Sequence, residues 1–61
     1  MTPNTMKRLA RYKRSEGRWY LQQSIEAEVY GLPSRVQEFE TLARKSFDRA
    51  SELELEASEP A

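Results

Sequence analysis

The chain has 61 residues, a net charge of zero from ten Lys/Arg and ten Asp/Glu, and neither cysteine nor histidine. A chain this short forms one small domain, here residues 1–61, near the lower size limit of a self-sufficient core. Lack of thiols and imidazoles excludes disulfides and zinc–thiolate sites and removes the commonest general base. We therefore expect a protein that is not an enzyme, has no cofactor or metal, and takes no small-molecule substrate.

The apolar residues stand in short runs along the whole chain. No run approaches the length of a membrane span or of a signal-peptide core. We therefore expect a cytoplasmic protein with no membrane partner. The apolar residues recur with helical spacing, which predicts an all-α fold.

The first predicted element is a short basic helix over residues 5–15, with Thr2 or Asn4 as its N-cap and Pro3 near its start. Its apolar side chains point roughly 120° away from those of the next segment if one unbroken helix is drawn. A kink or short loop at residues 15–17, around Gly17, lets both faces reach apolar surroundings. The alternative is one continuous helix that tolerates Gly17.

The second predicted element is a helix over residues 18–30, whose packing face is Leu21, Ile25 and Val29 at intervals of four. The same residues also alternate between apolar and polar, as in a strand. A strand here needs an intermolecular ribbon, because the chain offers no second strand for it to pair with. The composition favours the helix.

The third predicted element is a long amphipathic helix over residues 34–57. Gly31 and Pro33 predict a turn before it, and Ser34 with Gln37 predicts a capping box. Seven apolar residues share one stripe of this helix, namely Val36, Phe39, Ala43, Phe47, Ala50, Leu53 and Ala57. Residues 58–61 are expected to fray.

Together these elements predict an antiparallel helical hairpin in which residues 18–30 pack on the first half of the third helix. The second half then needs residues 5–15 or another copy, which predicts an oligomeric helical bundle. The expected interface between copies is Val36, Phe39, Ala43, Phe47, Ala50 and Leu53. The layout resembles plasmid copy-number regulators of the Rop type in architecture alone, and no motif transfers residue roles from them.

A cluster of basic and aromatic residues is the candidate contact surface, namely Lys7, Arg8, Arg11, Arg14, Arg18, Trp19 and Tyr20. Such residues neutralise phosphates and stack on bases, and they equally suit an acidic protein groove. The plainer alternative is a solvated face that partly neutralises the acidic C-terminal half. Trp19 is either a packing anchor or an exposed anchor beside the basic face.

The leading functional prediction is a small non-enzymatic adaptor, inhibitor or accessory subunit that engages another protein through a helix face. The alternative is an oligomeric nucleic-acid-binding regulator that uses the basic N-terminal helix. The zero net charge favours the solvated basic face over a nucleic-acid contact, because dedicated nucleic-acid domains carry a basic excess.

Overall fold

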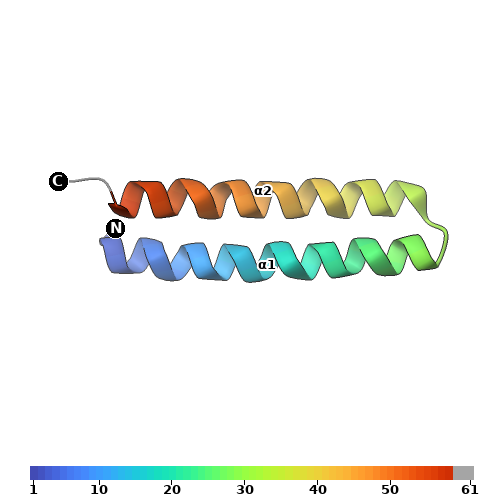
Figure 1. Ribbon diagram of the computed structural model, residues 1–61, viewed down its shortest axis with the longest axis horizontal. Coiled ribbons are helices and arrows are strands. Elements are labelled where there is room, and N and C mark those ends of the chain that lie inside the picture. Colours follow the sequence, from blue (N-terminus) through green and yellow to red (C-terminus); the bar gives the residue numbers. More distant parts are fainter. Residues whose placement is uncertain (59–61) are drawn as a thin grey trace.

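A computed structural model describes residues 1–58, which form two antiparallel helices, α1 (Pro3–Val29) and α2 (Pro33–Ser58) (Figure 1). The hairpin is a rod of 48 × 13 × 12 Å, with the first turn of α1 and the last turn of α2 at the same end. The predicted all-α hairpin is confirmed for these residues. Of the tail predicted to fray, Ser58 closes α2, and residues 59–61 lie outside the described part.

Helix α1 is continuous from end to end, so the break predicted at residues 15–17 is wrong, as is the strand alternative for residues 18–30. The Thr2 hydroxyl accepts a hydrogen bond from the Thr5 amide at 3.2 Å, which confirms Thr2 as the N-cap. Gly17 is not a hinge. A Cβ atom at Gly17 would lie only 2.8 Å from the Phe47 ring, so glycine here allows a close approach of that ring.

The turn between the helices closes α1 with a Schellman motif. The Leu32 amide donates to the Ala27 carbonyl at 2.9 Å, the Gly31 amide donates to Glu28 at 3.1 Å, and Gly31 has a φ of 70°. The Val36 amide then donates to the Leu32 carbonyl at 3.0 Å, which opens α2. The predicted N-cap at Ser34 is wrong, because Pro33 is already the first helical residue, a position that suits a residue without an amide hydrogen.

Small residues repeat every seven positions along the line where the helices meet. They are Ala10, Gly17 and Ser24 on α1 and Ala43 and Ala50 on α2, and all five are buried. A seven-residue repeat keeps one face of each helix toward its neighbour, and small side chains let the two backbones approach closely. We call these five residues the small-residue seam.

The largest buried side chain lies near the open end of the hairpin. Leu53 is 1% exposed and packs with Ala10 and Ala50, and Met6 and Leu9 cover this cluster from α1. The N-terminal part of α1 therefore lies alongside the second half of α2. It is the packing partner within the chain that this half of α2 needs.

The polar groups within this interface are satisfied inside the chain. The Ser46 hydroxyl donates to Glu16 Oε1 at 3.1 Å, and the Ser24 hydroxyl donates to the Leu21 carbonyl at 2.7 Å. Among the described residues no buried side-chain nitrogen or oxygen lacks a partner. The interface therefore buries Ser24 and Ser46 without the cost of an unpaired hydroxyl.

The packing face predicted for residues 18–30 is wrong. Leu21, Ile25 and Val29 are 40%, 61% and 78% exposed. Helix α1 instead turns Ser24 and Ala27 toward α2, about one position out of phase with the prediction. The seam of small residues gives a closer helix pair than branched side chains allow, and it leaves the larger apolar residues outside.

Candidate interaction surface on α1

A strip of charged and apolar residues runs along α1 directly beside the buried interface. Its members recur at alternating intervals of four and three and are Lys7, Arg11, Arg14, Arg18, Leu21, Ile25 and Glu28. Each follows by one position a residue on the face turned toward α2, so the same seven-residue period that makes the hairpin also aligns this strip. We call it the α1 strip; its first part is cationic and its second part is mainly apolar.

The cations of the strip differ in their surroundings. Arg14 pairs with Glu54 across the hairpin, where its Nε donates to Glu54 Oε1 at 2.9 Å and its Nη2 donates to the same oxygen. At Arg14 the plainer alternative, neutralisation by the acidic half of the chain, is therefore confirmed. Lys7, Arg11 and Arg18 form no ion pair with any carboxylate of residues 1–58.

The remaining predicted contact residues lie on two sides of the helix. Arg8 is exposed next to the strip, and Trp19 is 55% exposed on the outer side of α1. Tyr20 instead turns inward, where its ring stacks on Phe39 with centroids 6.3 Å apart. Trp19 contacts the Tyr20 ring edge to face at 5.4 Å. Trp19 is therefore exposed, its role as an anchor for a partner stays a prediction, and Tyr20 belongs to the hairpin interface.

The six residues predicted to join copies of the chain lie on the face of α2 that packs against α1. Ala43, Ala50 and Leu53 are buried, and Val36, Phe39 and Phe47 are half-buried. Their partner within the hairpin is α1, so an interface between copies through these residues stays a prediction. The exposed apolar side chains with most contact area to offer are on α1.

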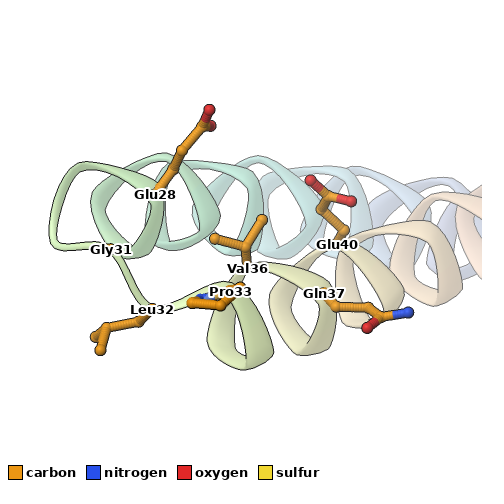
Figure 2. Close-up of a pocket in the computed structure, with 7 residues that line it drawn as sticks. All are labelled: Glu28, Gly31, Leu32, Pro33, Val36, Gln37 and Glu40. Carbon is orange, nitrogen blue, oxygen red and sulfur yellow. The ribbon is translucent and has the colours of Figure 1, made fainter.

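A shallow groove of about 500 Å³ lies at the turn end of the hairpin, where Leu32, Pro33 and Val36 line it with Gly31 and Gln37. Glu28 of α1 and Glu40 of α2 extend to the same side of this groove, with Val36 between them (Figure 2). The α1 strip thus ends in Glu28, at a groove that a second carboxylate, Glu40, also lines. Two exposed carboxylates next to apolar surface favour a cationic group of a binding partner.

Sequence reasoning placed the basic residues on one helix face but missed Leu21, Ile25 and Glu28 as surface residues. The available signal was the repeat of Ala10, Gly17 and Ser24, which matches the spacing of Ala43 and Ala50. The usual rule that large apolar residues are buried predicts Leu21 and Ile25 in the core. In this hairpin the small residues Gly17, Ser24 and Ala27 are buried instead.

No protein-family model, curated protein or solved structure matches the chain. Within residues 1–58, neither helix has a stretch both long and apolar enough to cross a membrane.

Proposed function

We propose that this chain is a non-enzymatic binding protein that engages another protein through the α1 strip. The observation that carries the proposal is the exposure of Leu21 and Ile25, at 40% and 61%, on a helix whose other face is already packed. Full burial of such a side chain contributes about 1.5–3 kcal/mol, which makes an exposed neighbouring pair a natural centre for an interface. Charged residues on both sides of the pair supply the polar rim that interfaces have.

Site-specific photo-crosslinking tests this proposal in the native cell. A photoreactive residue replaces Ile25 at the centre of the strip, and the control replaces Asp48, which is exposed on α2. We expect a discrete protein adduct from position 25, and loss of that adduct when Leu21→Lys is added. Equal labelling at positions 25 and 48 would contradict a binding surface on α1.

A second candidate function, nucleic-acid binding, is favoured by the cationic part of the same helix. Lys7, Arg8 and Arg11 are exposed and form no ion pair within residues 1–58, and Tyr12 and Trp19 are 63% and 55% exposed on the same helix. This combination suits a single strand, whose phosphates meet the cations while its bases stack on the rings. Arg14 contributes less, because Glu54 already neutralises it.

The salt dependence of the binding constant distinguishes nucleic-acid binding from protein binding, because phosphate contacts weaken steeply as salt is added. Binding of single-stranded oligonucleotides is followed by Trp19 fluorescence at several salt concentrations. The test variant is Lys7→Gln/Arg8→Gln/Arg11→Gln. The control variant is Arg35→Gln/Arg44→Gln/Lys45→Gln, which removes three exposed cations from α2. If the first set contacts phosphates, its loss makes the negative slope of log K against log salt shallower by about 2, at roughly 0.7 per contact, and the control leaves the slope unchanged. Equal slopes for the two variants would contradict a specific phosphate contact by Lys7, Arg8 and Arg11.

A further inference from the structure

We infer that the protein bound by the second part of the α1 strip is a second copy of this chain, joined through antiparallel α1 helices. The inference rests on the proposed function and names its partner. It follows from four residues, Arg18, Leu21, Ile25 and Glu28, which read as a cation, two apolar residues and an anion at intervals of three, four and three. We call them the Arg18–Glu28 motif.

The motif is complementary to itself when it is reversed. The midpoint of Leu21 and Ile25 and the midpoint of Arg18 and Glu28 both fall at position 23. A two-fold axis at that level therefore sets Leu21 against Ile25 of the partner subunit, about 3 Å on either side of the axis. It also sets Arg18 against Glu28 of the partner subunit, about 7.5 Å on either side. A parallel pair would instead place arginine beside arginine and glutamate beside glutamate.

Self-complementarity of this kind is the requirement of a two-fold interface, in which each residue of one subunit meets its counterpart in the other. A foreign protein would have to supply the same pattern in the same spacing, whereas a second copy always supplies it. Charge complementarity and apolar matching thus select the same occupant and the same direction.

All four residues of the motif are available to a partner. Arg18 and Glu28 are exposed, and neither forms an ion pair with a residue of the described chain. Arg18 Nη2 donates only to the Ser15 hydroxyl, at 3.2 Å. Glu28 and Glu40 line the same groove (Figure 2), so the end of the helix hairpin that receives Arg18 of the partner subunit carries a second carboxylate.

The apolar centre is small, two side chains from each copy, against about 800 Å² per partner in a standard interface. We therefore expect a dimer that dissociates on dilution, at about micromolar concentration. Sedimentation velocity over a dilution series of the full chain measures this equilibrium, and circular dichroism of the same samples reports whether each variant stays folded.

Charge reversal tests the pairing itself. Arg18→Glu opposes two carboxylates in a homodimer, and Glu28→Arg opposes two guanidinium groups, so we expect each variant alone to raise the dissociation constant at least tenfold. Mixing the two variants restores opposite charges at both contacts, so a heterodimer forms between them. Arg35→Glu and Glu38→Arg, exposed on α2, are the matched control and leave the wild-type dissociation constant unchanged.

Three results would overturn the inference: a wild-type chain that is monomeric at about 100 µM, a dimer indifferent to both reversals, or variants that remain monomeric when mixed. The crosslink at position 25 separates this failure from failure of the proposed function. Adducts between isotopically light and heavy copies support the inference. Adducts with a foreign protein alone keep the proposed function and refute the dimer, and no adduct of either kind refutes both.

Discussion

Gly17 weakens the helix locally but makes room for the Phe47 ring. A glycine inside a helix costs up to about 1 kcal/mol relative to alanine. Here the missing side chain gives room to the Phe47 ring, three of whose atoms would lie 2.8–3.0 Å from a Cβ atom at this position. The local cost of the glycine is thus offset by the packing of an aromatic ring over the helix backbone.

A double-mutant cycle measures these two terms separately. In a Phe47→Ala background, Gly17→Ala gains helix propensity and meets no ring, so we expect the free energy of unfolding to rise by about 1 kcal/mol. In the wild-type background the ring must move, and displacing a packed side chain costs about 1–3 kcal/mol, which cancels or reverses the gain. Urea unfolding of the four proteins gives the coupling. Equal effects of Gly17→Ala in both backgrounds would show that the ring does not restrict this position.

Gly31 is required for a different reason, its backbone conformation. Its φ is 70°, and a Cβ atom there would meet nothing within 4 Å. Gly31→Ala therefore adds no clash and tests the left-handed conformation alone, with an expected loss of about 1 kcal/mol in the free energy of unfolding. Gly31→Asn should lose less, because asparagine tolerates this region better. Thermal unfolding followed by circular dichroism checks the order, and equal stability of all three proteins would contradict it.

At the scale of the elements, α2 and the turn were predictable and the orientation of α1 was not. The seven apolar residues predicted on one face of α2 are all buried or half-buried, and Gly31 has the predicted conformation. The packed face of α2 carries large apolar residues as well as Ala43 and Ala50, whereas the buried residues of α1 are all small. A rule that ranks residues by apolar size therefore succeeds on α2 and selects Leu21, Ile25 and Val29 wrongly on α1.

The candidate site could likewise be predicted from the sequence only in part. The basic residues share a face because their spacing is helical, and a continuous helix α1 preserves that spacing. The pairing of Arg14 with Glu54 depends on which turns of two helices meet, and spacing within one helix does not contain that information.

The small-residue seam predicts that a large side chain between the helices destabilises the hairpin. Ala50 is 0% exposed where the helices meet, so Ala50→Leu must push them apart. We expect a loss of about 1–3 kcal/mol in the free energy of unfolding. The neighbouring exposed Ser51→Leu is the matched control and should stay within about 0.5 kcal/mol of wild type. Urea titration compares the two variants, and equal losses would contradict close packing at the seam.

For the molecule as a whole, the two helices share one small core. Leu53 is its largest fully buried side chain, and Leu53→Ala is expected to cost about 2–5 kcal/mol. A loss of that size approaches the whole stability of so small a domain. We therefore expect α1 to melt together with α2, with Trp19 fluorescence and helical ellipticity changing at one midpoint.

The control for this prediction lies two residues away. Leu55 is 65% exposed on the same helix, so Leu55→Ala should change the free energy of unfolding by less than about 0.5 kcal/mol. Separate transitions of the two signals in Leu53→Ala would show that α1 keeps its structure without α2.

The antiparallel layout also determines how the chain responds to tension. The first turn of α1 and the last turn of α2 lie at the same end of the 48 Å rod (Figure 1), so a pull on those two turns acts across the helix pair. Contacts then give way one turn at a time, from Met6 and Leu53 toward Gly31, and no two turns resist together. Residues 3–58 can reach about 190 Å when fully extended. The two pulled turns start about 10 Å apart, as neighbours in a packed helix pair, and can therefore separate to about 190 Å under a weak pull.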